Sequence, residues 1–396
     1  MMLCLGAFFS PLNEDRAKAT ERIAIQFGFV GRSIPVSSLA AFAEDGTIDQ
    51  SLRWYLRGVN PEVQEELRKA LTASREINPS EFSQLLHTPE GDVMLRYTGQ
   101  FIQTNSRDNG ARAIRGALVV AASQPEGISL LSFLQAFPTP ALRLDLGLIL
   151  THYRQVRRTI ADIDSFLSSV KETSQADAAK SSLSLNLESI SPLGEMGPYA
   201  VSMKPLILQD QTRDRTFPVD LYRPEDLNAV QGELSVLVLS HGLGGSRDLF
   251  ADFGEHLASH GFVVAIPQHI GSDRNQQLAV RRWLKHELFQ VSEFVDRPRD
   301  ISFLLDELER INATEFTGKL NLSKVGVLGH SFGGTTALTL AGATVDFDRV
   351  NQLCRLGTTI DVGLALLLTC RIRELQDSPE SIQLLSDGEL RMNEFP

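Results

Sequence analysis

The sequence predicts a mainly helical N-terminal domain followed by an α/β domain with a doubly wound, mostly parallel sheet, and three observations support this. Residues 21–170 show helical periodicity after one short pair of extended segments. Residues 171–192 are rich in Ser, Ala and charged residues, which is typical of a linker. Residues 193–396 then alternate short, β-branched apolar runs with helical segments. That alternation predicts parallel strands covered by helices.

The bulk composition sets the class of protein. The chain has 396 residues, 42% of them hydrophobic, and a formal net charge of −11. Such an acidic chain does not indicate binding to nucleic acid or to an anionic membrane surface. No apolar run reaches the roughly 18 residues of a membrane-spanning helix. We therefore expect a globular protein without a transmembrane segment, and its oligomeric state stays open.

The first 20 residues allow two interpretations. Leu3–Ser10 is apolar, and Ala17-Lys18-Ala19 resembles a small-residue cleavage site, as in a signal-peptide remnant. Against export, no basic residue precedes the apolar run, and Glu14 and Asp15 follow it closely. The alternative is an ordinary or disordered N-terminus, so cytoplasmic and exported, periplasmic locations both remain open.

The N-terminal domain, residues 21–170, begins with alternating apolar residues that predict a small β-hairpin around Gly28 and Gly31. Asn60-Pro61 and Asn78-Pro79 each combine a helix N-cap with a proline in the first turn. Further helical patterns cover Arg112–Ser123, Ile128–Phe137 and Val156–Val170. Because His, Cys and carboxylates do not cluster at ligand spacing here, we expect a packing, lid or partner-binding role.

The α/β domain, residues 193–396, starts with two extended segments joined by a polar turn. Its expected strands are Tyr199–Leu208, Phe217–Tyr222, Ser235–Ser240, Gly261–Ile266 and Lys324–Leu328. Helical segments at Asp248–Ser259 and Pro298–Arg310 separate the last three. Open α/β sheets bind their ligands at the carboxyl ends of such strands.

Two glycine-rich motifs follow two of these strands. Gly329-His330-Ser331-Phe332-Gly333 has the form G-x-S-x-G between a strand and a helix, which predicts a nucleophilic serine on a sharp turn. We expect a positive φ at Ser331. Ser240-His241-Gly242-Leu243-Gly244-Gly245 follows an earlier strand, where this arrangement supplies an oxyanion hole. The expected oxyanion donors are the backbone N–H groups of Leu243 and Phe332.

These motifs resemble those of a known family. HGLGG, PQHIGSD (Pro267–Asp273), RPRDISFLLDEL (Arg297–Leu308) and GHSFGG are similar to the α/β-hydrolases related to platelet-activating-factor acetylhydrolase and dienelactone hydrolase. Glu21–Gly46 resembles an uncharacterised helical domain that precedes such hydrolases in bacteria. The resemblance implies an α/β-hydrolase sheet, hydrolysis of a small-molecule or lipid ester by Ser331, and neither a cofactor nor a metal.

The C-terminal end departs from that family. The acid and the histidine of the triad normally follow the serine, but no histidine follows His330 in this sequence. The strands that would carry them are also not indicated. We therefore expect a C-terminally incomplete hydrolase domain with little activity. The alternatives are a non-catalytic relative that binds an acyl ligand or a protein partner, and an acyltransferase on the same fold.

Four further residues have open roles. His241 and His269 lie at strand ends near that of Ser331, and each is either structural, substrate-facing or a replacement base. Cys354 and Cys370 flank an apolar segment, so they form a disulfide if the protein is exported or remain free thiols in the cytosol.

Overall fold

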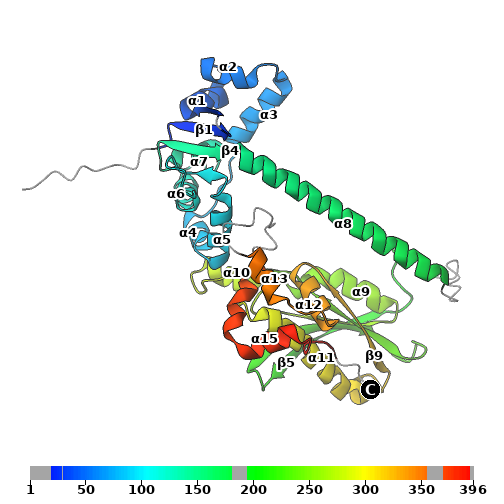
Figure 1. Cartoon of the computed structure of the whole chain (residues 1–396). Coiled ribbons are helices and arrows are strands. Elements are labelled where there is room, and N and C mark those ends of the chain that lie inside the picture. The colour runs from blue at the N-terminus through cyan, green and yellow to red at the C-terminus, as the bar shows by residue number, and fades with distance from the viewer. Residues whose placement is uncertain (1–18, 29, 181–193, 355–368, 393–396) are drawn as a thin grey trace, which may run out of the picture. The chain divides into compact units, whose positions relative to one another are not determined.

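The computed structural model describes residues 19–28, 30–180, 194–354 and 369–392 (Figure 1). The chain divides into two compact units. Unit 1 comprises Met1–His87 and Gly91–Arg154, and unit 2 comprises Thr88–Glu90 and Gln155–Pro396. The first 18 residues, with their two interpretations, lie outside the described part of the chain.

Unit 1 is built on a small sheet with the strand order β2-β1-β4-β3. The strands are β1 (Arg22–Phe27), β2 (Val30–Pro35), β3 (Ile102–Gln103) and β4 (Ala141–Asp145). The helices are α1 (Val36–Asp45), α2 (Gln50–Leu56), α3 (Pro61–Thr72), α4 (Pro79–Leu86), α5 (Pro89–Thr98), α6 (Ala111–Ala122) and α7 (Leu130–Ala136). Asn60 and Asn78 cap α3 and α4 with their side chains, as their sequence context predicts.

The expected hairpin is part of a larger sheet. β1 and β2 pair antiparallel, and β4 then pairs with β1 in parallel, with Ile23 opposite Leu142. Both side chains enter the core of unit 1, together with Phe42, Ala117 and Phe137. Sequence reasoning missed β4 because its five residues carry too few alternations to be distinguished from the helix that follows directly.

Helix α8 (Leu146–Lys180) follows β4 without a break and crosses the expected boundary at residue 170. Residues 171–180, which we expected to be linker, are helical, and the compact units divide at Arg154 instead. Ala, Glu, Lys and Gln favour helix as much as they favour a solvated linker, so composition alone could not separate the two. The rest of the expected linker, residues 181–192, lies outside the described residues.

Unit 2 contains a five-stranded sheet with the order β5-β6-β8-β7-β9. The strands are β5 (Val201–Asp210), β6 (Arg215–Pro224), β7 (Leu234–Ser240), β8 (Val263–Pro267) and β9 (Leu320–Gly329). β8, β7 and β9 are parallel, whereas β5 and β6 form an antiparallel hairpin that pairs with β8. The parallel strands therefore appear where the apolar runs predicted them, in a sheet that is mixed rather than mostly parallel.

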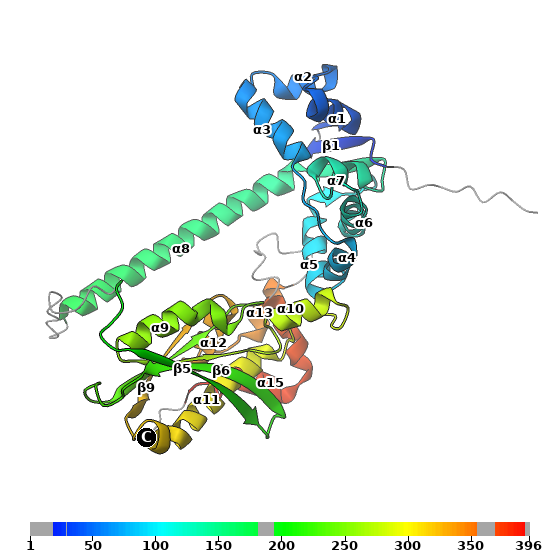
Figure 2. The same ribbon diagram turned by 180° about the vertical axis from the view of Figure 1, so that it is seen from behind.

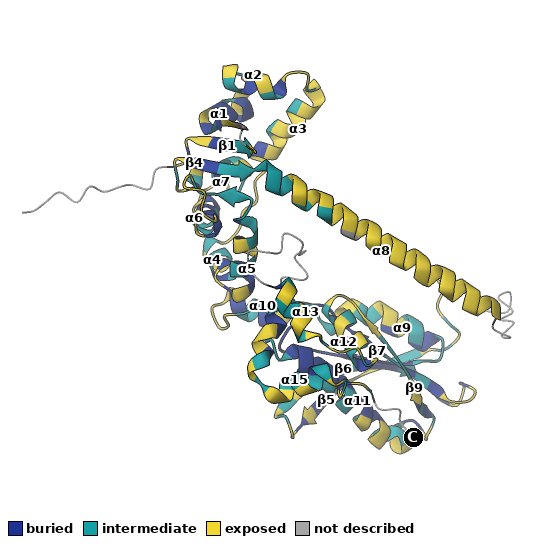
Figure 3. Ribbon diagram, viewed as in Figure 1, coloured by how far each residue is buried: buried dark blue, intermediate teal, exposed yellow. Residues whose placement is uncertain are grey.

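Helices cover both faces of this sheet. The described helices after β7 are α9 (Ala251–Ser259), α10 (Arg274–Arg281), α11 (Glu293–Glu315), α12 (Phe332–Leu340), α13 (Phe347–Leu353) and α15 (Pro379–Ser386), with 3-10 turns η2 (Arg247–Phe250) and η3 (Cys370–Asp377). Strand β8 contributes to two cores: Val264 packs with Ala258 of α9, and Val263 packs with Ile301 of α11. Figure 2 shows α9 and α11 on opposite faces. The buried strands between them form the dark band in Figure 3.

Candidate active site at the end of strand β9

Ser331 occupies the sharp turn between β9 and α12. The strand ends at Gly329 and the helix begins at Phe332, so only His330 and Ser331 make the turn. Ser331 has φ 53° and ψ −115°, a conformation that non-glycine residues rarely adopt. The His330 N–H donates to the Ser240 carbonyl at 3.2 Å, which attaches the turn to the end of β7. The expected strained turn is present, and Ser331 itself is exposed.

The two glycines of the motif allow the turn to close. A Cβ on Gly329 would lie 1.9 Å from the Gly333 carbonyl oxygen. A Cβ on Gly333 would lie 1.9 Å from the carbonyl oxygen of Ser240. Both contacts are with backbone atoms, which cannot rotate away as a side chain can. The spacing of the motif therefore has a steric cause in this fold.

The loop after β7 lies directly against this turn. A Cβ on Gly242 would come within 3.2 Å of the Ser331 Cβ, so the loop backbone passes close to the serine. The loop is fixed by the Gly244 N–H, which donates to the Ser272 carbonyl at 2.8 Å. Within the described parts of the chain, no backbone carbonyl accepts a hydrogen bond from the N–H of Leu243 or of Phe332. Two free donors beside a serine have the composition of an oxyanion hole.

An apolar cavity of about 240 Å³ opens at Ser331. Its lining consists of Leu243, Phe289, Phe294, Ser331, Phe332, Thr335 and Thr369. The three phenylalanine rings contact one another, with centroids of Phe294 and Phe332 4.8 Å apart. Sequence reasoning missed Phe289 and Phe294, because neither the segment before α11 nor the first turn of that helix carries a motif. Their apolar residues were the only available signal.

His241 and His269 do not face this cavity. Both side chains are fully buried. The His241 Nδ1–H donates to the Gly242 carbonyl at 2.9 Å, and its Nε2 accepts from the His269 backbone N–H at 3.1 Å. Burial lowers the pKa of His241 to about 4 and lowers that of His269 well below its usual value. Burial and these hydrogen bonds favour a structural role for both histidines over a substrate-facing one.

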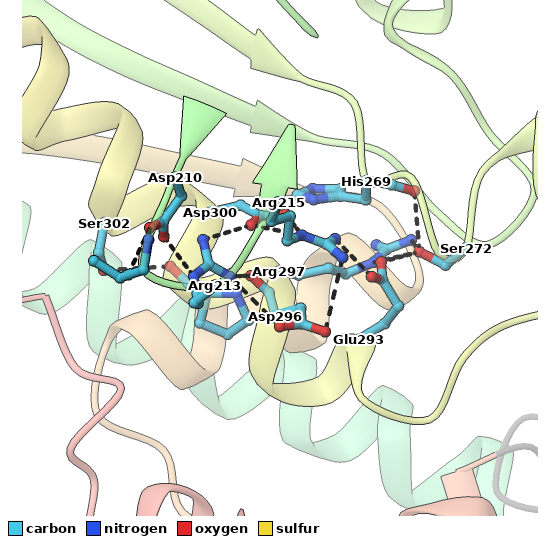
Figure 4. Close-up of polar contacts among 12 residues, drawn as sticks. Asp210, Arg213, Arg215, His269, Ser272, Glu293, Asp296, Arg297, Asp300 and Ser302 are labelled. Carbon is cyan, nitrogen blue, oxygen red and sulfur yellow. Dashed lines mark hydrogen bonds and ion pairs between the residues drawn. The ribbon is translucent and has the colours of Figure 1, made fainter. Parts of the chain in front are cut away.

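A buried network of ion pairs and hydrogen bonds contacts the loop after β7 (Figure 4). Arg297 of α11 is fully buried, and its guanidinium donates to the His241 carbonyl at 2.7 Å and to the Ser272 Oγ at 2.7 and 3.0 Å. The guanidinium carbon also lies 4.1 Å from the centre of the Phe332 ring. Burial lowers the pKa of Arg297 to about 10, so the side chain stays charged at neutral pH. One cation thus contacts both segments that carry the candidate oxyanion donors.

Acidic side chains of α11 balance the buried arginines. Glu293 pairs with Arg215 at 2.7 Å and lies 3.4 Å from Arg297. Asp300 accepts from Arg213 at 2.8 Å and from Arg215 at 2.9 Å. Burial raises the pKa of Asp300 to about 6, and Arg215 opposes that rise. The network joins the β5–β6 hairpin to α11 through partners about 80 positions apart, so sequence spacing gave no signal for it.

The remaining candidate residues are the two cysteines. Cys354 and Cys370 are joined as a disulfide, with Cα atoms 5.6 Å apart. The apolar segment between them falls mostly on residues 355–368, which lie outside the described structure. Nowhere in the described ranges do three His, Cys, Asp or Glu side chains gather in a way that could hold a metal ion. Nor is any helix there long and apolar enough to cross a bilayer.

Comparison with known proteins agrees with this geometry. A family model described as "alpha/beta hydrolase fold" matches residues 235–367, which include both glycine-rich motifs. The C-terminal domain has the α/β-hydrolase fold. A second model, described as "Alpha/beta hydrolase of unknown function (DUF1400)", matches residues 19–145. The predicted fold class, an α/β-hydrolase sheet behind a mainly helical N-terminal region, is therefore confirmed.

Two groups of curated relatives share part of the hydrolase domain. The platelet-activating factor acetylhydrolase of Cavia porcellus is 28% identical over 137 residues, covering 26% of this chain and 30% of the relative. Chlorophyllase-1, chloroplastic, of Citrus unshiu is 30% identical over 149 residues, covering 34% of this chain and 37% of the relative. The chain thus spans about a third of the length of these relatives, which are esterase-like hydrolases.

Proposed function

We propose that the site at Ser331 is that of a serine hydrolase of the carboxylesterase or lipase type, acting on small-molecule or lipid esters. The observation that carries the proposal is the strained turn at Ser331, which opens into an apolar cavity. Beside it lie two backbone N–H groups that donate to no carbonyl within the described residues. In this mechanism the Ser331 Oγ attacks the acyl carbonyl. The N–H groups of Leu243 and Phe332 then stabilise the oxyanion, and the three phenylalanines contact the acyl chain.

Among the described residues, neither histidine at the neighbouring strand ends is placed to accept the proton of Ser331. A serine hydroxyl is a weak nucleophile unless an imidazole accepts its proton. His241 and His269 are buried, have lowered pKa values and are hydrogen-bonded to loop backbone or to Ser240. We therefore expect the 396-residue chain to hydrolyse esters slowly, with the contribution of the oxyanion hole and binding alone, about 10³- to 10⁴-fold over water.

A transition-state analogue tests the nucleophile without requiring turnover. An alkyl trifluoromethyl ketone should add slowly to the Ser331 Oγ, with the hydroxyl proton passing to solvent water, and give a hemiketal whose oxyanion occupies the hole. Fluorine NMR detects this adduct as a new bound resonance. The resonance should be absent in Ser331→Ala and present in the control Ser323→Ala, which changes an exposed serine of the same strand. Failure of the wild-type chain to form the adduct would refute the proposal.

Ester hydrolysis then tests the argument that Ser331 lacks a general base. With a short-chain p-nitrophenyl ester, we expect the wild-type rate to stay within about tenfold of that of Ser331→Ala, because both proteins keep the oxyanion donors. Robust wild-type turnover that Ser331→Ala abolishes would overturn the missing-base argument. The buried histidines also favour a second candidate function, a relative that binds an acyl ligand without turning it over. That function predicts saturable ester binding equal in both proteins and no covalent adduct.

A further inference from the structure

Helix α8 carries a regular apolar stripe on its surface. Its members are Tyr153, Val156, Ile160, Ile163, Leu167 and Val170, spaced alternately by three and four residues. All six are exposed, from 40% at Val156 to 57% at Tyr153. Leu146 and Ile149 continue the same spacing toward the N-terminus of the helix. Alternating spacings of three and four define the a and d positions of a coiled-coil heptad.

Such a stripe requires a partner to become stable. Away from the stripe, α8 is largely polar, and its last turns carry Ser, Gln, Asp and Lys. A single helix gains most of its stability in proteins by burying its apolar face. The stripe is the width of a coiled-coil seam, narrower than the apolar face that packs onto a globular core. Its geometry therefore fits one further helix of matching period.

We propose that this stripe is an interface between two copies of the chain, whose α8 helices pair as an antiparallel two-stranded coiled coil. A two-fold axis between Ile160 and Ile163 places Ile160 of each copy opposite Ile163 of the other. The same register places Tyr153 opposite Val170, and Val156 opposite Leu167, so every member of the stripe has an apolar partner. The interface is self-complementary, as a two-fold dimer requires.

Charges beside the stripe select this orientation. Arg157 and Asp164 both occupy the e position of the heptad. In an antiparallel pair, e positions face each other, so Arg157 of each copy meets Asp164 of the other, and the pair forms twice. In a parallel pair, Arg157 would instead meet His152 of the second copy, which offers no opposite charge. Phe166, 66% exposed at position g, also becomes covered at the edge of the antiparallel seam.

Sedimentation equilibrium of the full chain over a concentration series tests the interface. The wild type should be a dimer, and Ile160→Asp should be monomeric because it places a carboxylate in the seam. Arg157→Asp should weaken dimerisation by about tenfold, since it replaces two attractive pairs with two repulsive ones. The double variant Arg157→Asp, Asp164→Arg should restore it. Arg158→Asp makes the same charge change at the outward f position and should leave the dimer unchanged.

Three results would overturn the proposal. A wild-type chain that is monomeric at every concentration would mean that the stripe is covered within the chain itself. A dimer that survives Ile160→Asp would place the interface elsewhere. Failure of the charge-swapped double variant to recover would exclude the antiparallel orientation. Circular dichroism of each variant checks that it folds, and the exposure of the substituted side chains makes folding the expected result.

Discussion

Replacing the buried cation behind the oxyanion loop should destabilise unit 2 strongly. Arg297→Met keeps most of the volume of the side chain but removes the donors to the His241 carbonyl and to Ser272 Oγ. It also leaves Glu293 without its neighbour at 3.4 Å. Removing one partner of a buried pair costs about 3–5 kcal/mol. Because Arg215 still pairs with Glu293 at 2.7 Å, we expect the loss of unfolding free energy to lie at the lower end of this range, about 3 kcal/mol.

Urea titration followed by circular dichroism measures this loss of unfolding free energy. For a unit of this size, the same loss lowers the melting temperature by about 6–12 °C. Arg310→Met is the matched control, since it makes the same substitution on the same helix at an exposed residue paired with Glu307. That control should change the free energy by less than about 0.5 kcal/mol. If Arg297→Met came within about 1 kcal/mol of wild type, the network could not be a structural support of the loop.

Two further predictions concern the same region. Gly333→Ala should destabilise the fold and prevent formation of the ketone adduct, because its Cβ would lie 1.9 Å from the Ser240 carbonyl oxygen. The control Gly334→Ala has its nearest contact at 3.4 Å and should be neutral or stabilising by up to about 1 kcal/mol. Equal melting temperatures of the two variants would contradict this prediction. The folded-state pKa of His241, about 4, lies below its ordinary value of 6.5, so its contribution to stability is complete above pH 6.5 and is lost as the pH falls toward 4. The free energy of unfolding of the wild type should fall by about 3 kcal/mol through this titration, and His241→Gln should lack this contribution. Unfolding free energies of the two proteins that run parallel against pH would refute the prediction.

Sequence patterns predicted the parts of the fold that depend on local signals. The strands of unit 2 were expected within a few residues, because β7 and β8 are short buried apolar runs and β5 and β6 flank a polar turn. The turn at Ser331 was expected from glycines whose spacing the structure explains sterically. Strand β4 was missed because its five residues show little alternation of their own, and its partner β1 lies more than a hundred positions away.

The site was predicted less completely than the fold. The positions of Ser331, Leu243 and Phe332 around one cavity followed from motif order. Arg297 is the first residue of the motif RPRDISFLLDEL, but its role depends on its being fully buried. Arginine side chains are mostly exposed in proteins, so nothing in the sequence indicated this burial. The histidines were placed at the correct strand ends, but strand position alone does not determine whether a ring faces solvent or the core.

The backbone at Ser331 has a consequence for how this sequence can evolve. A φ of 53° with a ψ of −115° is a region that glycine enters freely and that a Cβ makes strained, by about 1–3 kcal/mol. Ser331→Gly would relieve that strain while leaving the neighbouring glycine contacts intact, so a lineage selected for folding alone would drift toward glycine here. Serine at this position therefore carries a cost in stability that glycine would avoid.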